Sequence, residues 1–419
     1  MKSNIAIFVL AIIVGLTGCA RHEQSLTGGI TIAVPQWYAP EKVASLAHVI
    51  ADWNATHPQA AVSCKVLPGK RDALLQKILL AAQRGELADA VLVRNEWLGR
   101  LAAEGLIDPL PDALAATVRR SALPSLLLAI GDGQRIWATP FDADALVVWL
   151  RRDLADERDP KWTDQPWSLD RLASLAAKLT DRTNPAAVRY GFAFQGARSP
   201  NAANAFLPWY FGRGGRAVDE QGNLTLDAAP AAAALAWLMS LVKSGAAPSA
   251  AASLEQNDVF NGLAGGAFAM TLGGSWERGM LARQSHFGDR IKAMPAPTAS
   301  ERNTTTLLGG WSFVLLKKRH TDIAGFLALT LSGLVQREKL SHDSLLPVTV
   351  ASLQQPWFLT SPDGPTLRQA LLNGESLPFH KDLDFYLDTV ATMIAEVSLG
   401  KQTPSEAAGL AAENIRQKK

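Results

Sequence analysis

Residues 30–104 alternate between short β-favouring runs and stretches of helical periodicity, and this pattern constrains the fold more than any other feature of the chain. The first run, residues 30–34 (ITIAV), is rich in β-branched side chains, and residues 41–56 then place apolar side chains along one helix face. The pair recurs twice, with strands expected at residues 62–67 and 88–93 and helices at residues 71–84 and 96–104. Strands that alternate with helices pair in parallel beneath two helical layers, so the sequence predicts an α/β fold.

The rest of the chain predicts a second α/β unit. A helical stretch at residues 114–130 leads to a strand at 136–139 that Pro140 interrupts, and another β-favouring segment follows at 142–149. We interpret residues 139–144 as a crossing between two lobes. Later strands are expected at 268–272 and 307–316, and helices at 168–179, 201–211, 228–243, 255–263, 323–331, 383–397 and 404–417. The predicted lobes are residues 30–139 with 307–343, and residues 140–306 with 344–419.

The N-terminus has the layout of a bacterial export signal. Lys2 gives a positive start, and residues 5–16 (IAIFVLAIIVGL) carry no charge before Thr17, Gly18 and Cys19. As a helix this stretch would extend about 18 Å against roughly 30 Å of bilayer hydrocarbon, so a permanent span is not expected. Residues 16–19 (LTGC) resemble the lipobox of bacterial lipoproteins, which implies a signal peptide at 1–18, a lipid on Cys19, a tether at 19–29 and an extracytoplasmic location. The alternative is an ordinary exported protein with a cysteine near its cleavage site.

The composition indicates a chain that is held together by its core. Of its 419 residues, 48% are hydrophobic and 19% are charged, which provides ample apolar surface to bury and a length that suggests two domains. With Cys19 lipidated, Cys64 is the one thiol left, so no intramolecular disulfide is expected. Removal of residues 1–18 takes away Lys2 and leaves 40 basic against 39 acidic residues. A net charge of +1 does not indicate a nucleic-acid-binding protein, which typically carries a basic surface.

Six motifs follow one another along the chain. They are residues 85–91 (GELADAV), 101–110 (LAAEGLIDPL), 132–140 (DGQRIWATP), 166–172 (PWSLDRL), 265–270 (GGAFAM) with 273–276 (GGSW), and 309–311 (GGW) with Leu346 and Pro347. In this order they resemble the extracellular solute-binding proteins of ABC importers, in particular the maltose- and sugar-binding group, over residues 30–415. Residues 149–153 (WLRRD) lack an asparagine that the family usually has, and Trp311 stands where the family commonly has a smaller residue.

The resemblance implies a two-lobed periplasmic-binding-protein-like fold, in which each lobe is a mostly parallel sheet flanked by helices and the ligand cleft lies between the lobes. It also implies a monomer without cofactor or metal. Such a protein captures a small polar solute, here predicted to be a mono- or oligosaccharide, and presents it to the membrane subunits of an importer. We expect the lobes to close about residues 139–144 and 307–310, because hinges are a few positions at chain crossings.

Ligand-binding candidates follow from two rules, that small ligands bind between domains and at the carboxyl ends of parallel strands. The candidates are Gln36, Trp37 and Tyr38 after the first strand, Asn95, Glu96 and Trp97 after the third, Asp142 and Asp144 at the crossing, and Asn204, Trp209, Trp276 and Trp311 from later segments. By the resemblance, Trp276 corresponds to the tryptophan of the family's Gly-x-Trp motif, which faces the ligand. Indole faces suit the C–H groups of a sugar, and fixed carboxylates and amides suit its hydroxyls. Trp53, Trp149 and Trp237 lie within helix or strand patterns and are expected in the core.

Two alternatives to a sugar-binding protein stay open. In the first, Glu96, Asp142 and Asp144 are counter-charges for a polyamine or another cation, which the indoles would also bind by cation–π contact. In the second, Glu96 with Asp142 or Asp144 is the acid/base pair of a glycoside hydrolase. Other enzyme signatures are missing from the sequence: the seven histidines form no His-Glu-x-x-His motif, and Glu277 stands where a nucleophile elbow would have its closing glycine. The first strand runs into Pro35 rather than into glycines that could cradle a pyrophosphate.

Overall fold

The computed structural model describes residues 29–164, 167–184, 186–284, 286, 290–299, 306–317 and 323–418. The predicted signal peptide, Cys19 and all but the last residue of the predicted tether lie outside the described residues. Within the described part of the chain, no helix has the length and apolar character needed to cross a membrane.

Lobe 1 begins with the predicted alternation of strands and helices. Strands β1 (Ile30–Pro35), β2 (Val62–Leu67) and β3 (Ala90–Arg94) are parallel, with β1 in the middle. The intervening and following elements are α1 (Ala44–Thr56), α2 (Arg71–Gln83), η2 (Asn95–Trp97), α3 (Leu98–Ala103), β4 (Ile107–Asp108), α4 (Asp112–Ser121) and α5 (Pro124–Ile130). Five of the six residues of β1 and all five of β3 are buried, so these two strands are covered on both faces, whereas the edge strand β2 has only its two end residues buried.

Two long strands join lobe 1 to lobe 2. Strand β5 (Ala138–Arg151) runs through Pro140 without a break, and β8 (Leu307–Leu316) lies antiparallel to it. The expected interruption at Pro140 is therefore wrong. Pro140 lies beside a shift in register between β5 and β8, because Pro140 faces Ser312 while Asp142 faces Trp311. A proline, which has no N–H to donate, is tolerated next to such a bulge.

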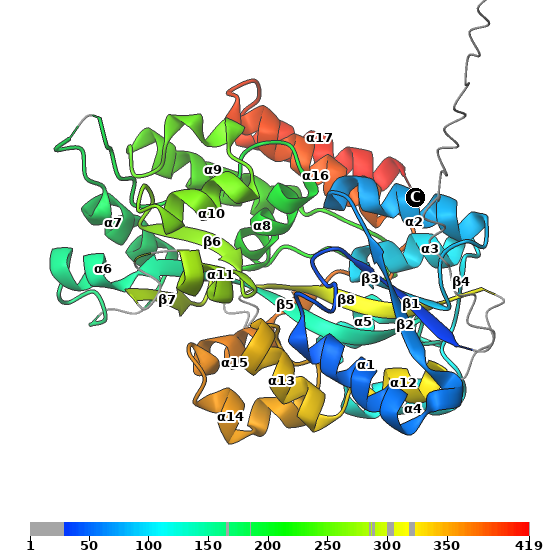
Figure 1. Cartoon of the computed structure of the whole chain (residues 1–419). Coiled ribbons are helices and arrows are strands. Elements are labelled where there is room, and N and C mark those ends of the chain that lie inside the picture. Colours follow the sequence, from blue (N-terminus) through cyan, green and yellow to red (C-terminus); the bar gives the residue numbers. More distant parts are fainter. Residues whose placement is uncertain are drawn as a thin grey trace, which may run out of the picture.

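Lobe 2 is built on the second half of β5. Strands β6 (Met270–Gly274) and β7 (Ile291–Met294) both pair antiparallel with β5, and β8 is also antiparallel to β3, so the sheet is mixed rather than mostly parallel. The helices are α6 (Arg152–Arg158), α7 (Leu169–Leu179), α8 (Pro200–Phe211), α9 (Ala228–Lys243), α10 (Gln256–Ala264) and α11 (Glu277–Gln284), joined by α16 (Leu383–Ser398) and α17 (Pro404–Gln417). Figure 1 shows α16 and α17 packed along lobe 2 beside α8 and α9.

Most of the segment between β8 and α16 packs on lobe 1. It contains α12 (Ile323–Leu329), α13 (Gly333–Asp343), η5 (Val350–Gln354), α14 (Pro356–Leu359), α15 (Gly364–Asn373) and β9 (Glu375–Ser376). Leu346, Phe358 and Leu371 are buried in the same hydrophobic cluster as β1 and β3, whereas Leu377 and Leu383 belong to the cluster of lobe 2. The lobe boundaries stay a prediction, but these contacts favour residues 344–373 in lobe 1 and a third crossing at residues 374–382.

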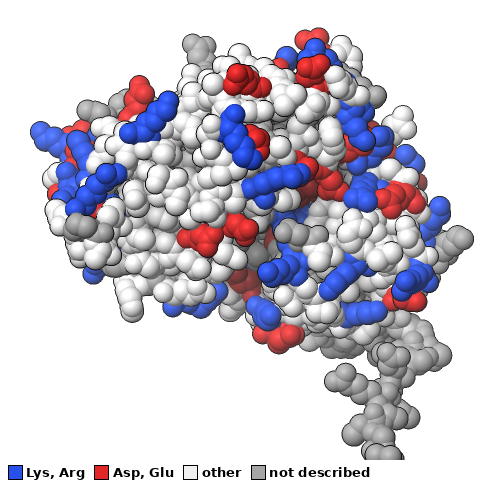
Figure 2. All heavy atoms as spheres, turned by 90° about the horizontal axis from the view of Figure 1, so that it is seen from above, with Lys and Arg blue, Asp and Glu red and all other residues white. Residues whose placement is uncertain are grey.

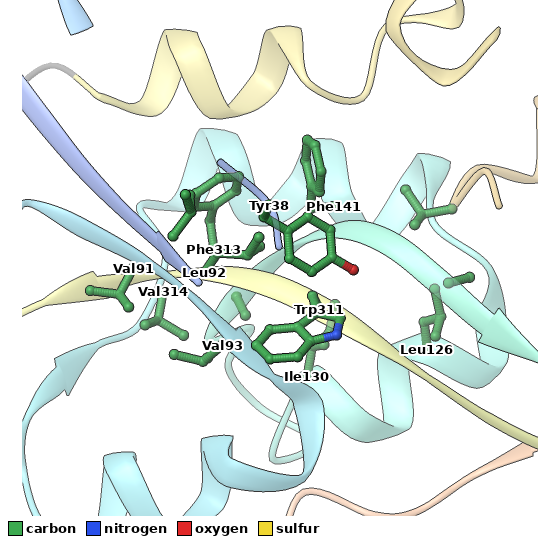
Figure 3. Packing of buried hydrophobic residues seen from close by; sticks show 14 of the residues in the cluster. Tyr38, Val91, Leu92, Val93, Leu126, Ile130, Phe141, Trp311, Phe313 and Val314 are labelled. Atoms are coloured by element: carbon green, nitrogen blue, oxygen red, sulfur yellow. The ribbon is translucent and has the colours of Figure 1, made fainter. Parts of the chain in front are cut away.

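The alternating side chains of β5 divide between the two hydrophobic cores. Ala143, Ala145, Val147 and Trp149 belong to the first cluster, and Leu146, Val148 and Leu150 belong to the second. Successive side chains of a strand point to opposite faces, so one strand anchors both cores. Figure 3 shows part of the first cluster, where the ring of Tyr38 lies between those of Phe141 and Trp311. The candidate site lies where this cluster meets lobe 2.

Candidate ligand-binding site

A buried arginine connects two of the predicted carboxylates. Strand β3 is apolar until its last residue, Arg94, whose side chain is directed to the lobe boundary. Its Nε and Nη2 donate to the two carboxylate oxygens of Glu96 at 2.9 and 2.6 Å, and its Nη1 donates to Oδ2 of Asp144 at 2.8 Å. This fork-to-carboxylate geometry is the strong form of an ion pair. Arg94 therefore fixes both carboxylates in one arrangement.

Glu96 also accepts a hydrogen bond from lobe 2. Asn204 of α8 donates its Nδ2 to Oε1 of Glu96 at 3.2 Å, and Nη2 of Arg71 lies 3.6 Å from the same oxygen. The remaining amide oxygen of Asn204 is buried without a hydrogen-bond partner. A buried carbonyl oxygen without a partner favours a donor such as a ligand hydroxyl or a water.

Four aromatic side chains, Trp37, Tyr38, Trp97 and Trp311, form what we call the aromatic wall. The ring centroid of Trp311 lies 5.6 Å from that of Trp37, 5.4 Å from Tyr38 and 5.8 Å from Trp97. The Arg94 guanidinium lies 5.5 Å from the Trp311 ring. Figure 3 shows Trp311 beneath Tyr38 on β8. Trp311, whose size departs from the family pattern, is the centre of this wall.

Asp142 ties the aromatic wall to the crossing strand. One of its carboxylate oxygens accepts from the hydroxyl of Tyr38, and the other accepts from the backbone N–H of Trp311 at 2.8 Å. Gly310 has a φ of +144°, and a Cβ there would lie 2.2 Å from the carbonyl oxygen of Asp142. Only glycine lets β8 approach β5 this closely in this conformation.

The carboxylates of the site differ in their protonation. Burial, followed by repulsion from Asp144, raises the pKa of Asp142 to about 7, against the hydrogen bonds from Tyr38 and Trp311. Burial also raises the pKa of Asp144, with Arg94 opposing it. For Glu96 burial acts in the same sense, but the charge and hydrogen bonds of Arg94 outweigh it and lower the pKa to about 2. Glu96 is thus ionised throughout the physiological range.

Trp276 reaches the boundary from lobe 2. It follows β6, and the backbone N–H of Ser275 donates to the carbonyl of Ala145, next to Asp144, at 2.9 Å. The half-buried Trp276 ring packs over Gly274, where a Cβ would lie 2.1 Å from the ring. Glycine at 274 therefore makes room for the indole.

Three candidates do not join this group. Gln36 is exposed, and its backbone N–H donates to the carbonyl of Leu67 at 3.0 Å. Asn95 accepts from the hydroxyl of Ser312 at 2.6 Å, on the face of β8 opposite to Trp311. Trp209 lies in the core of lobe 2 with its ring 4.9 Å from that of Trp237, about 140° around α8 from Asn204.

Sequence reasoning missed two buried cations, Arg94 and Lys339. Arg94 had a detectable signal, since it is a charged residue that ends an otherwise apolar strand directly before the candidates Asn95 and Glu96. Lys339 lies in α13, a helix that the sequence pattern does not predict, and it is fully buried. Only the tertiary contacts place it near Asp142.

The described residues offer no metal site and no reactive thiol. No group of three or more His, Cys, Asp or Glu side chains within the described ranges could hold a metal ion. Cys64 is half-buried, and burial followed by the charge of Glu41 raises its thiol pKa to about 11. Figure 2 shows basic and acidic side chains interspersed over one face of the molecule. That distribution fits the near-neutral net charge.

Solved structures of two-lobed solute-binding proteins share this fold. The GacH receptor of Streptomyces glaucescens, solved unliganded and with acarbose, superposes with a TM-score of 0.77 at 21% identity over 93% of this chain and 98% of that one. A solute-binding protein of Thermotoga lettingae bound with α-D-tagatose gives 0.78 at 18% identity over 93% and 99%. At such identities the likeness shows the fold alone.

Family membership rests on the sequence match. Residues 39–322 match the model of the bacterial extracellular solute-binding proteins, and this chain belongs to that family. A Streptomyces antibioticus protein named as an uncharacterized lipoprotein is 25% identical over 313 residues, which cover 72% of this chain and 66% of that relative. This chain therefore spans slightly less than two thirds of that relative's length.

Proposed function

We propose that this protein is the substrate-binding component of an ABC importer and captures a neutral mono- or oligosaccharide between its lobes. The observation that carries the proposal is the make-up of the lobe boundary, where the aromatic wall lies beside hydrogen-bonding groups from both lobes. Burial of about 70 Å² on one indole face contributes roughly 2 kcal/mol. Two such faces with a few hydrogen bonds reach micromolar affinity, about 8 kcal/mol.

Entry of a ligand requires the lobes to separate. Glu96, Asp144, Asn204 and Trp311 are each less than a tenth exposed, and the Asn204–Glu96 hydrogen bond spans the boundary. We propose that the lobes open and close about β5 near residues 139–144 and β8 near residues 307–310, with residues 374–382 as the third connection. Ligand favours the closed form because each lobe alone offers part of its partners.

The pairing of the carboxylates argues against a polyamine ligand. Both oxygens of Glu96 accept from Arg94, both oxygens of Asp142 accept from lobe 1 donors, and Asp144 also pairs with Arg94. A cationic ligand needs carboxylate oxygens that are free to accept its N–H groups, whereas these oxygens already accept from the protein. A neutral ligand needs only hydrogen-bonding capacity, which the Asn204 amide oxygen provides.

The same geometry argues against a glycoside hydrolase. Glu96 has a pKa of about 2 and holds no proton to give at neutral pH. Asp142 has a pKa of about 7, but it is fully buried and both of its oxygens are engaged. A general acid or base must reach the proton that it transfers. A binding role without catalysis therefore agrees best with this site.

Calorimetric titration with maltose, maltotetraose, α-D-tagatose, ribitol and spermidine tests the ligand class. We expect at least one sugar or polyol to bind with a dissociation constant of about 1–10 µM, with no binding of spermidine and no cleavage of the maltodextrins. Binding of spermidine in place of the sugars would establish the cation-binding alternative. Release of new reducing ends would establish the enzyme.

The lipid anchor is a separate part of the proposal. The LTGC sequence at residues 16–19 and the lipoprotein name of the Streptomyces antibioticus relative support acylation of Cys19 and an extracytoplasmic location. In a bacterial host that processes lipoproteins, Cys19→Ser should leave the protein folded but release it from the membrane fraction. A variant that pellets with membranes as the wild type does would rule out this anchor.

A further inference from the structure

Lys339 is a fully buried lysine, and burial lowers its pKa to about 7. It lies on α13, its Nζ donates to the carbonyl oxygen of Phe141, and the ammonium lies 4.8 Å from the centre of the Phe141 ring. Among the residues that the structure describes, no carboxylate lies within ion-pairing distance of Nζ, although Asp142 of β5 and Asp343 of α13 act on it at longer range. Burial of an ammonium is costly. Such a residue calls for an explanation other than stability.

The carbonyl that Lys339 binds belongs to the bulge of the crossing strand. Pro140 faces Ser312 and Asp142 faces Trp311, so Phe141 is the extra residue of β5 in its pairing with β8. The extra residue of a bulge is left out of the hydrogen-bonded ladder. The Nζ of Lys339 donates to the carbonyl oxygen of this extra residue.

The next residue after the bulge holds the aromatic wall. Asp142 accepts from the Tyr38 hydroxyl and from the Trp311 backbone, and the Tyr38 ring also packs edge-on against Phe141 at 6.1 Å. A change in the conformation of Phe141 would therefore move Asp142, and with it Tyr38 and Trp311. The contact path runs from α13 through the bulge to the candidate site.

We propose that Lys339 is a positioning residue, which fixes the β5 bulge through the Phe141 carbonyl and thereby orients Asp142 and the aromatic wall for ligand binding. The proposal predicts that loss of the Nζ donor loosens the wall without reducing global stability. A lysine with a merely structural role would affect the whole fold and spare the local geometry.

Hydrogen exchange of the unliganded protein tests this coupling. In Lys339→Met we expect the Trp311 amide, which donates to Asp142, to exchange at least about tenfold faster, while the urea midpoint is unchanged or higher. Lys77→Met is the matched control, because the exposed Lys77 also donates to a backbone carbonyl, that of Pro68 at 2.9 Å. Unchanged exchange at Trp311 would overturn the proposal. Failure of Lys339→Met to fold would overturn it too, because it would make the lysine a stability residue.

A second measurement depends on the proposed function. With whichever compound of the panel binds the wild type, Lys339→Met should bind at least about fivefold more weakly and Lys77→Met equally well. Equal affinity of Lys339→Met and wild type would refute the link to the ligand. If nothing in the panel binds the wild type, the proposed ligand class fails, whereas the exchange measurement still decides the role of Lys339.

Discussion

Glu96 in lobe 1 and Glu277 in lobe 2 are both buried near the candidate site, but their pKa values are shifted in opposite directions. Glu96 is paired with Arg94, and its pKa is lowered to about 2 in spite of burial. Glu277 follows Trp276 directly, and burial raises its pKa to about 7, since it faces only the neutral groups of Gly274, Gln256 and Trp149. A neighbouring cation therefore decides the charge of a buried carboxyl. At the candidate site, lobe 1 presents the paired charges of Arg94, Glu96 and Asp144 beside the aromatic wall, whereas lobe 2 presents the neutral side chains of Asn204 and Trp276.

Replacement of Arg94 should have the largest effect on stability, because Glu96 would then be a buried carboxyl without a neighbouring cation, as Glu277 is. Arg94→Met leaves Glu96 and Asp144 buried without their partner, which should cost about 3–5 kcal/mol of unfolding free energy at pH 7. Urea denaturation measures this loss. The exposed Arg152–Asp156 pair of α6 provides the control, because Arg152→Met should change stability by no more than about 0.5 kcal/mol. Equal stabilities for the two variants would contradict the role of Arg94.

The opposite pKa shifts predict opposite dependences of stability on pH. The stabilisation from Glu96 is present above the unfolded pKa and is lost as the pH falls towards 2, whereas that from Glu277 is present at low pH and is lost as the pH rises through 7. Between pH 4.5 and 8, Glu277→Gln should therefore remove a decline in unfolding free energy on the order of 3 kcal/mol. Denaturation at several pH values compares the variant with wild type. Parallel pH profiles would show that Glu277 does not titrate in this window.

The neutral surface of lobe 2 should divide into ligand-contacting and core tryptophans. Trp276→Ala is expected to weaken binding of the panel sugar at least tenfold, about 1.4 kcal/mol, with little change in the melting temperature. Trp209→Ala, in the core beside Trp237, should instead cost roughly 3–5 kcal/mol of stability. Calorimetry and thermal unfolding separate the two effects. A large loss of stability with unchanged affinity in Trp276→Ala would place that residue in the core.

The hydrogen bond from Asn204 to Glu96 should affect the balance between the open and closed forms rather than the stability of either lobe. Asn204→Ala removes the hydrogen bond to Glu96 across the boundary, and we expect the closed form to lose about 1.5 kcal/mol. Small-angle scattering should then give a larger radius of gyration for the unliganded variant than for wild type, and a smaller one for both at saturating sugar. A radius that does not change with ligand would favour a rigid, preformed pocket.

The sequence predicts individual strands and helices well where the pattern of apolar residues within one segment decides them. Strands β2 and β8 and helix α17 have the bounds that the sequence predicts. The predicted break at Pro140 is wrong because a proline usually ends a strand, whereas here it lies beside a bulge. The antiparallel pairing of β5 with β6 and β7 was also not foreseen, since alternation of strands and helices predicts parallel pairing.

The sequence by itself determined the class of fold and most of the residues that meet at the lobe boundary, because strand ends and motif order can be read along the chain. The tertiary structure decided which of these residues share a face, and it separated Asn95 and Trp209 from the others. It also revealed Arg94 and Lys339, whose partners Asp144 and Phe141 lie 50 and 198 residues away. The charge state of a buried group depends on its neighbours in space, and periodicity within a segment holds no information about them.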